Sequence, residues 1–326
     1  MMKRISILIL ALVPVTLWAQ FAPAQDKPGT TAMHADSSAF VAWATGCTVE
    51  RGPMRIDNPE NGLASYGADS LALGMPGGTF DVVSLGDGGI ATLTFGSPIC
   101  NVAGPDFAVF ENGFANAMNP DTWALELGFV EVSSDGVNFF RFPAVSNVQT
   151  DTQLGNSGSI DPAQLHNFAS KYGAFYGTPF DLDEVEDNEL LDKNRVTHVR
   201  IVDVVGNISP EYASYDSEGH IVNDPWPTGF NSSGFDLDAV GVIHDVAHFD
   251  VNENELMAIA LYPNPVKYRL TVNTENLQSV EVFNLVGQLV RTSTANIIDF
   301  GDLNEGIYFV RVTAGGKTAT QRIVKQ

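Results

Sequence analysis

The sequence predicts an all-β protein: an antiparallel jelly-roll β-sandwich with one short helix in an insertion, followed by a small Ig-like β-sandwich. Short runs of alternating or continuously apolar residues recur along the 326-residue chain, as is typical of β-strands. Clusters of Gly, Asn, Asp and Ser separate these runs and provide turns. Strands do not alternate with helix-length amphipathic segments, which excludes a parallel α/β sheet.

The strands of the main domain can be placed in chain order. The first hairpin joins residues 81–85 to residues 90–95 through a Gly-rich turn. A buried strand at 106–110 follows this hairpin. The next segment, 123–132, alternates polar and apolar residues over its second half, and a Ser-Asp-Gly turn then reverses the chain. The later strands are predicted at 106–110, 123–132, 138–142, 196–205 and 235–243.

One helix is predicted to interrupt these strands, over residues 161–173. Asp161 suits the N-cap, Pro162 suits the first helical position, and Gly173 suits the end of the helix. The apolar residues between them recur at helical spacing: Leu165, Phe168 and Tyr172.

The N-terminus has the features of a secretory signal peptide, predicted over residues 1–19. Lys3 and Arg4 precede an apolar stretch that is too short for a stable transmembrane helix. Cleavage is expected after Ala19, with residues 22–24 as a second position. No cysteine lies near either position, which argues against a lipoprotein anchor, and no later run of about 18 apolar residues predicts a transmembrane segment.

Residues 20–36 are polar and are expected to form a loose leader. The sandwich is predicted over 37–248, a polar linker over 249–258, and the second sandwich over 259–326. In the second sandwich, strands are expected at 269–273, 279–283, 289–291, 307–312 and 319–324.

Three motifs of this tail occur in a fixed order: Leu-Tyr-Pro-Asn-Pro at 261–265, Val-Phe-Asn-Leu-Val-Gly-Gln-Leu-Val at 282–290, and Gly-Ile-Tyr-Phe-Val-Arg-Val at 306–312. With them, residues 259–326 resemble the C-terminal sorting domain (type A) of the type IX secretion system of Bacteroidota. The resemblance implies recognition by that secretion machinery and export across the outer membrane. The product would be secreted or held on the outer cell surface. An Ig-like accessory domain is the alternative.

Net charge is distributed unevenly. The chain carries −22 overall, whereas residues 1–19 and 259–326 each carry +2, so that residues 20–258 carry −26. Such a domain repels nucleic acid and anionic membranes and suits cations or neutral ligands. A hydrophobic content of 44% with 20 Phe indicates a folded core and argues against disorder.

Cys47 and Cys100 are the two cysteines of the chain. In an exported protein a single pair usually forms a disulfide, which is the prediction. Two thiols acting in catalysis are the alternative, but no histidine lies nearby in the sequence.

The main domain also carries shorter resemblances. Residues 130–139, 198–202 and 234–240 are similar to strands of the galactose-binding-like jelly rolls of discoidin-type modules, across about 100–250. Residues 105–114 are similar to segments of uncharacterised cell-surface proteins of Bacteroidota, some of them associated with corrinoid uptake.

Carboxylates and amides in the loops predict a structural Ca²⁺ site, because Ca²⁺ takes six to eight oxygen ligands in flexible geometry. An EF-hand is excluded, since the loop that starts at Asp216 lacks the downstream Glu. A solvated acidic surface is the alternative. The predicted ligands are Asp106, Glu111, Asn112, Asp216, Asp224, Asp236 and Asp238, with Asp203, Glu218 and Asn223 as further candidates.

No enzymatic activity is predicted. The sequence contains neither a Gly-x-Ser-x-Gly nor a His-Glu-x-x-His motif, and its six histidines are scattered. Asp236 and Asp238 lie on one face of a strand and could serve as the two carboxylates of a glycoside hydrolase, which is a less favoured reading of the pair.

Aromatic residues in the two long insertions predict ligand contact, since aromatic faces stack on sugar rings. Trp226, held between two prolines, is the foremost candidate; packing of these aromatics onto the sheet is the alternative. The predicted contacts are Tyr176, Tyr215, Trp226 and Phe230, with Tyr172, Phe175 and Tyr212 in the same insertions.

The predicted function is therefore a secreted or cell-surface, non-catalytic protein that binds a carbohydrate or another small ligand. A structural or adhesive surface protein would share the same export signals and the same sandwich. An accessory protein of corrinoid uptake would also fit, given the resemblance of residues 105–114.

Overall fold

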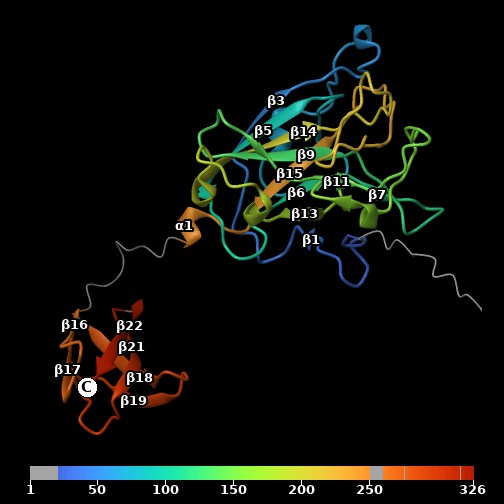
Figure 1. The fold of residues 1–326 in the computed structure, drawn as a ribbon. Helices are drawn as coiled ribbons and strands as arrows, with labels where there is room; N and C mark the ends of the chain where they lie inside the picture. The colour runs from blue at the N-terminus through green and yellow to red at the C-terminus, as the bar shows by residue number, and fades with distance from the viewer. Residues whose placement is uncertain (1–20, 250–259, 275, 316) are drawn as a thin grey trace, which may run out of the picture. The chain divides into compact units, whose positions relative to one another are not determined.

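The computed structural model describes residues 21–249, 260–274, 276–315 and 317–326. The chain divides into two compact units, Met1–Phe249 and Asp250–Gln326 (Figure 1). Each unit has its own hydrophobic core. The predicted signal peptide 1–19 and most of the predicted linker 249–258 lie outside the described residues.

Two antiparallel sheets form the N-terminal unit. The first sheet has the order β1-β13-β6-β15-β2, with β4 also pairing with β15, and the second has the order β10-β9-β14-β5-β3. The strands of the first sheet are β1 Met33–His34, β2 Ala42–Trp43, β4 Val83–Ser84, β6 Phe107–Glu111, β13 Tyr176–Phe180 and β15 Asp236–Val242. Those of the second are β3 Gly46–Glu50, β5 Ile90–Ile99, β9 Gly128–Ser133, β10 Phe140–Arg141 and β14 Val196–Asp203.

Smaller elements complete this unit. Two short strand pairs are β7 Phe114–Ala115 with β8 Trp123–Ala124, and β11 Val145–Ser146 with β12 Leu165–His166. The α-helix of the described residues is α1, Val246–Phe249. Single 3-10 turns occur at Pro59–Asn61, Asp69–Ala72, Pro162–Gln164, Leu182–Glu184 and Lys193–Arg195.

The core between the two sheets follows from strand alternation. Phe107 and Val109 of β6 point into it, as do Val130 and Val132 of β9. On the other face of the first sheet, the intervening residues Ala108 and Phe110 belong to a separate cluster with Phe40 and Trp43. All seven residues of β15 are buried, because both faces of the first sheet are covered. The predicted all-β sandwich is thus confirmed.

The helix predicted over 161–173 is wrong beyond its first turn. Asp161 does cap a turn that begins at Pro162, and its side chain accepts a hydrogen bond from the Ala163 amide. The chain then becomes extended as β12, and Asn167 has a positive φ of 53°. The Ala169 amide donates to the carbonyl of Gly128, the first residue of β9. Pairing with neighbouring strands thus overrides the local helical signals.

The leader predicted to be loose over 20–36 is instead packed against the domain. Its strand β1 pairs with β13, and Ala24 and Ala35 are buried. Gln25 accepts a hydrogen bond from the Gly173 amide at 2.7 Å. These contacts make the segment part of the first sheet.

The C-terminal unit is a small sandwich of two antiparallel sheets that fits an Ig-like domain. One sheet has the order β16-β17-β20 and the other β19-β18-β21-β22, and the core includes Leu270, Val280, Phe300 and Val310. The strands are β16 Ala260–Tyr262, β17 Arg269–Asn273, β18 Leu277–Asn284, β19 Leu289–Ser293, β20 Ile297–Asp299, β21 Gly306–Ala314 and β22 Lys317–Lys325.

The predicted disulfide between Cys47 and Cys100 is absent from the structure. Cys47 lies on β3 opposite Leu93 of β5, whereas Cys100 follows the far end of β5. Cys100 is therefore seven positions further along the chain than Leu93, the residue that faces Cys47, whereas a disulfide needs Cα atoms within about 7 Å. Burial raises the pKa of the Cys47 thiol to about 12, which makes it a poor nucleophile.

Candidate functional site

Strand directions bring the ends of four strands to the same end of the N-terminal sandwich. Leu237, near the start of β15, pairs with Glu111 at the end of β6. In the other sheet, Gly128 at the start of β9 pairs with Asp203 at the end of β14. Asp203 accepts a hydrogen bond of 2.6 Å from the Phe235 amide just before β15, which ties this end of one sheet to the same end of the other.

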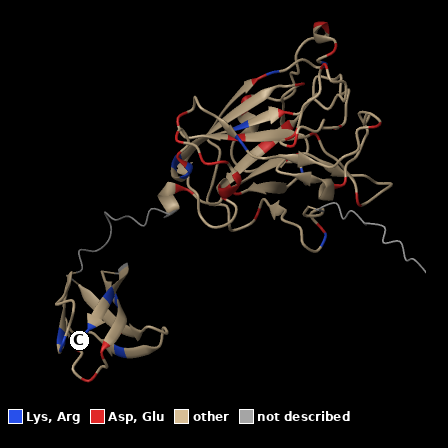
Figure 2. Cartoon of the chain, viewed as in Figure 1, with Lys and Arg blue, Asp and Glu red and all other residues tan. Residues whose placement is uncertain are grey.

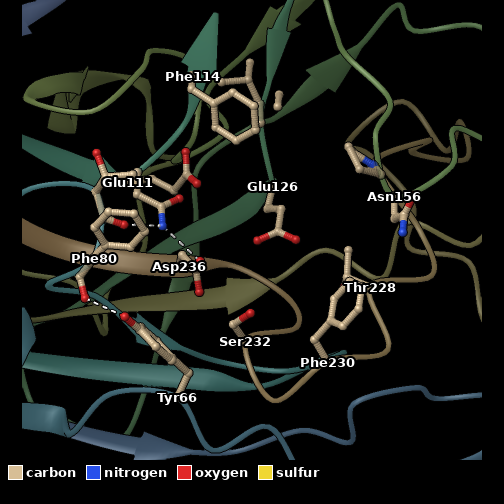
Figure 3. Close-up of a pocket in the computed structure, with 15 residues that line it drawn as sticks. Tyr66, Phe80, Glu111, Phe114, Glu126, Asn156, Thr228, Phe230, Ser232 and Asp236 are labelled. Carbon is tan, nitrogen blue, oxygen red and sulfur yellow. Dashed lines mark hydrogen bonds between the residues drawn. The ribbon is translucent and has the colours of Figure 1, made fainter. Parts of the chain in front are cut away.

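A cavity of about 400 Å³ lies at this end (Figure 3). Its lining combines acidic and aromatic side chains that come from loops and strand ends. Three carboxylates line it, those of Glu111, Glu126 and Asp236, together with the amides of Asn112 and Asn156. Four aromatic side chains also line it: Tyr66, Phe80, Phe114 and Phe230.

Glu111 lies on the core side of β6, because alternation places it on the same face as Phe107 and Val109. Its carboxylate accepts hydrogen bonds from the Ser170 hydroxyl at 2.6 Å and from the Gly113 amide at 2.8 Å. Burial, with a smaller contribution from the neighbouring Asp236, raises the pKa of Glu111 to about 8. Glu111 is thus mainly protonated near neutral pH.

Asp236 opens strand β15 and is held by two side chains. The hydroxyl of Ser84 donates to one carboxylate oxygen and the Asn112 amide donates to the other at 3.0 Å. Burial raises the pKa of Asp236 to about 6, although these hydrogen bonds and Arg51 lower it in part. The donors fix the orientation of the carboxylate at the cavity wall.

Glu126 precedes β9 and differs from the other two carboxylates. It lies between Leu125 and Leu127, which are buried in a hydrophobic cluster, and its side chain points into the cavity (Figure 3). Within the described part of the chain, no donor makes a hydrogen bond to it. The residue is only partly buried, yet surrounding protein and the nearby charges of Asp236 and Glu111 raise its pKa well above the usual value.

Phenylalanines surround the cavity with unusual exposure to solvent. Phe80 is 79% exposed, Phe114 is 64% exposed and Phe230 is 56% exposed. They come from three separate segments: the loop before β4, the β7–β8 hairpin and the loop before β15. Figure 3 shows Phe80, Phe114 and Phe230 on different sides of the cavity. Their convergence provides apolar surface for a ligand.

Further acidic residues lie behind this site and hold the loops. Asp203 accepts from the amides of Gly88 and Phe235, and Asp224 accepts from the Leu127 amide at 2.6 Å. Asp87 accepts from the Ile56 amide and from the Trp226 indole. Burial raises the pKa of each of these carboxyls. Their hydrogen bonds make them structural supports of the site.

The seven predicted calcium ligands do not form one site. Only Glu111, Asn112 and Asp236 line the cavity. Asp106 lies just before the opposite end of β6 and accepts from the Val102 amide. Asp216 accepts from two amides of its own loop and from the Ser146 amide of β11. Asp238 accepts from the amides of Gly77 and Gly78. No group of three His, Cys, Asp or Glu suited to a metal occurs within the described ranges, and calcium binding stays a prediction.

One of the four predicted ligand aromatics, Phe230, lines the cavity. Trp226, predicted to be an exposed contact, is only 9% exposed and donates its indole N–H to Asp87 at 2.9 Å. Tyr215 is exposed but does not line the cavity. Tyr176 lies on β13 and packs edge-on against His34. The loop around Trp226 still contributes Pro225, Thr228 and Phe230 to the lining.

Sequence reasoning missed Tyr66, Phe80, Phe114, Glu126 and Asn156. The sequence did contain one signal for Glu126. It lies between two leucines, and because side chains alternate in an extended segment, a carboxylate there points away from the face that the leucines bury. Another signal was Phe80, which follows a Pro-Gly-Gly-Thr segment where a large apolar residue has no strand to join.

Comparisons with known proteins bear mainly on the C-terminal unit. Residues 260–326 match the family model described as the secretion system C-terminal sorting domain. No curated protein matches the chain. Within the described residues, no helix has the length and hydrophobicity needed to cross a membrane. The predicted resemblance of the main domain to discoidin-type modules stays a prediction.

Two solved structures are similar over part of their length. One is the BSP domain of a biofilm associated protein, with 12% identity, coverage of 73% of this chain and 48% of that chain, and a TM-score of 0.17. The other is the β-glucuronidase of Ruminococcus gnavus, with 12% identity, coverage of 94% and 46%, and a TM-score of 0.19. The similarity covers about half the length of each of these two structures, and TM-scores this low support no functional argument. Residues 260–326 form a type IX secretion sorting domain, and the protein is exported to the cell surface or secreted.

Proposed function

We propose that the N-terminal unit is a binding domain for a small carbohydrate, which occupies the cavity at the Glu111 end of the sandwich. The observation that carries this proposal is the convergence of three exposed phenylalanines, Phe80, Phe114 and Phe230, on a cavity lined by carboxylates. Leaving such a side chain in water forgoes roughly 1.5–3 kcal/mol of burial. Several of them around one polar cavity are typical of a ligand site.

A carbohydrate suits this lining better than a purely apolar ligand. A sugar ring has apolar faces that stack on aromatic rings and hydroxyl groups that donate to carboxylates and amides. The cavity offers both kinds of group: aromatic rings, and the side chains of Glu126, Asn112 and Asn156. Its volume of about 400 Å³ is near the lower end of the range typical of small-molecule sites. This favours a mono- or disaccharide over a corrinoid.

The test is calorimetric titration of the purified protein with neutral and amino mono- and disaccharides. Phe230→Ala and Phe114→Ala should each weaken binding by about tenfold, the factor that corresponds to 1.4 kcal/mol. Tyr215→Ala is the matched control, because Tyr215 is 46% exposed but lies outside the cavity. Equal affinity in all three variants, or no binding of any sugar, would reject the proposal and favour a structural or adhesive role.

Glycoside hydrolysis is the second candidate, favoured by the unequal acidity of two carboxyls in the same cavity. Glu111, with a pKa of about 8, is suited to donate a proton, whereas Asp236, with a pKa of about 6, is mainly ionised at neutral pH. Paired carboxyls of unequal pKa are the machinery of glycosidases. The Asp236–Asp238 pair considered from the sequence is less suited, since Asp238 is held by Gly77 and Gly78 away from the cavity.

Turnover of aryl glycosides distinguishes the two candidates. A hydrolase should release the aryl group at a rate that Glu111→Gln lowers at least a hundredfold. The binding proposal expects the rate to equal that of the buffer blank for every substrate, with sugar binding retained.

A further inference from the structure

The charges of the cavity are not balanced by the protein. None of the fifteen residues that line it is Lys, Arg or His, whereas three of them are Glu or Asp. The nearby cation Arg51 donates from both terminal nitrogens to the backbone carbonyls of Tyr66, Ser84 and Gly67, and its side chain is not part of the cavity lining. Figure 2 shows the many acidic residues of this unit. A site of this kind attracts cations.

The three carboxylates differ in their remaining capacity to accept hydrogen bonds. Two of them already hold protein donors: Glu111 accepts from Ser170 and Gly113, and Asp236 accepts from Ser84 and Asn112. Glu126 accepts none from the described residues and points into the open centre of the cavity (Figure 3). An ionised carboxylate offers about four acceptor positions, so Glu126 is the group best able to receive a charged donor from a ligand.

The aromatic rim favours the same kind of ligand. Faces of Phe rings attract organic cations within about 6 Å of the ring centre, and the attraction grows when the cation is desolvated. Phe80, Phe114 and Phe230 approach the cavity from different sides. A cation bound at Glu126 would thus have both a carboxylate and aromatic surface as neighbours. A small inorganic ion would make little contact with the aromatic surface, whereas an organic ammonium group on a ring would contact both the carboxylate and the phenylalanines.

We infer that the natural ligand carries a protonated amine and that Glu126 is the residue that binds it. The inference rests on the proposed function, because it assigns a ligand class to the same cavity. An amino sugar is the sugar that fits it: its ammonium group donates to Glu126 and its ring packs on the phenylalanines. Glu126 would then determine specificity for amine-bearing over neutral sugars.

Binding should also depend on pH. The charged groups that act on Glu126 are Asp236, Glu111, Asp224 and Asp203, all acidic, and Arg51 acts on Asp236. An ammonium ligand binds the ionised carboxylates, so its affinity should rise as pH increases from 5.5 to 7.5 and the carboxyls lose protons. A neutral sugar should show a much weaker dependence.

The test compares three probes by calorimetric titration of the purified protein at pH 7: D-glucose, its 6-amino-6-deoxy analogue, and cyclohexylamine. The amino sugar should bind at least tenfold more tightly than glucose, as expected for an added charge-assisted hydrogen bond. Glu126→Gln preserves the size of the side chain but removes its charge, and it should abolish this preference for the amino sugar over glucose. The matched control is Glu60→Gln, since Glu60 is exposed and lies outside the cavity; it should retain the preference.

Each outcome separates the inference from the proposed function. Equal affinity for glucose and its amino analogue, or a preference that survives Glu126→Gln, would reject the inference while the carbohydrate proposal stands. Binding of cyclohexylamine without binding of either sugar would support the amine and reject the carbohydrate. Absence of binding by all three probes would reject both.

Discussion

Strand β6 has a buried carboxylate at each end, and the two ends serve different purposes. Asp106, just before the strand, accepts hydrogen bonds from the amides of Val102 and Leu182, each at 2.9 Å, and lies 2.9 Å from His244 Nδ1. It is completely buried and lines no described cavity. Asp106 thus fastens two loops and the segment after β15 to the sheet, and its acceptor capacity is used within the protein.

At the other end of β6, three carboxylates lie beside an accessible cavity. Glu111 and Asp236 each hold two protein donors, and Glu126 holds none among the described residues, yet all three line one cavity rimmed by exposed phenylalanines. Burial of a carboxylate therefore does not by itself identify a functional site. The proposed site rests instead on unused acceptor capacity beside an accessible cavity, and of the two ends only the Glu126 end combines these features among the described residues.

The largest effect that separates the two ends is expected for Asp106→Ala. This change leaves two buried amides without an acceptor, at about 1–3 kcal/mol each, so the free energy of unfolding should fall by about 3 kcal/mol. For a domain of this size that corresponds to a Tm lower by roughly 6–12 °C. Thermal unfolding followed by circular dichroism measures it. Sugar affinity at temperatures well below Tm should be unchanged.

Glu126→Gln is the contrasting variant at the opposite end. It removes a charge from a cluster of like charges and breaks no hydrogen bond among the described residues, so its Tm should equal or exceed that of the parent protein. A Tm loss as large as that of Asp106→Ala would show that Glu126 is structural, and the contrast between the two ends would fail.

Much of the architecture could be predicted because local pattern and tertiary pairing agree. The alternating residues 235–243 and 196–205 became β15 and β14, and the tail strands formed where expected. Prediction failed where pairing opposed local signals, as at Leu165 and His166, which joined β11 instead of continuing a helix. The pattern of a single segment does not reveal such a partner from elsewhere in the chain.

The site was harder to predict because distant segments build it. Glu111, Asn112, Asp236 and Phe230 were found as acidic, amide or aromatic loop residues, but nothing local distinguished them from Asp106 or Trp226, which the fold uses internally. Whether a polar group is satisfied depends on amides contributed by other loops, such as Gly77 and Gly78 for Asp238. Only the assembled sandwich shows that Glu126 has no such donor among the described residues.

The raised pKa values of the buried carboxyls should also make the stability of the N-terminal unit depend on pH, with a smaller effect than that of Asp106→Ala. The folded-state pKa values are about 8 for Glu111 and about 6 for Asp236 and Asp238, above ordinary values of 4.5 and 3.8. A raised folded-state pKa stabilises the folded protein at low pH, because the folded state holds protons that the unfolded chain releases. This contribution is complete below about pH 4 and is lost as pH rises through 6 towards 8. Tm should therefore fall by a few degrees between pH 5 and pH 7.5.

Asp236→Asn isolates the contribution of the cavity from the general repulsion among acidic residues. The variant removes a titrating group, so its Tm should fall less than that of the parent over the same pH range. Asp135→Asn is the control, because hydrogen bonds from Asn138 and Val137 hold the pKa of Asp135 well below the range tested, and its pH profile should match the parent.

The range stops at pH 7.5 because Lys171, whose pKa burial lowers to about 8, contributes in the opposite direction above it. A Tm that stays constant or rises from pH 5 to pH 7.5 would mean that the cavity carboxyls are ionised throughout. Asp236 would then resemble the ordinary surface acids, and its burial would not govern its charge.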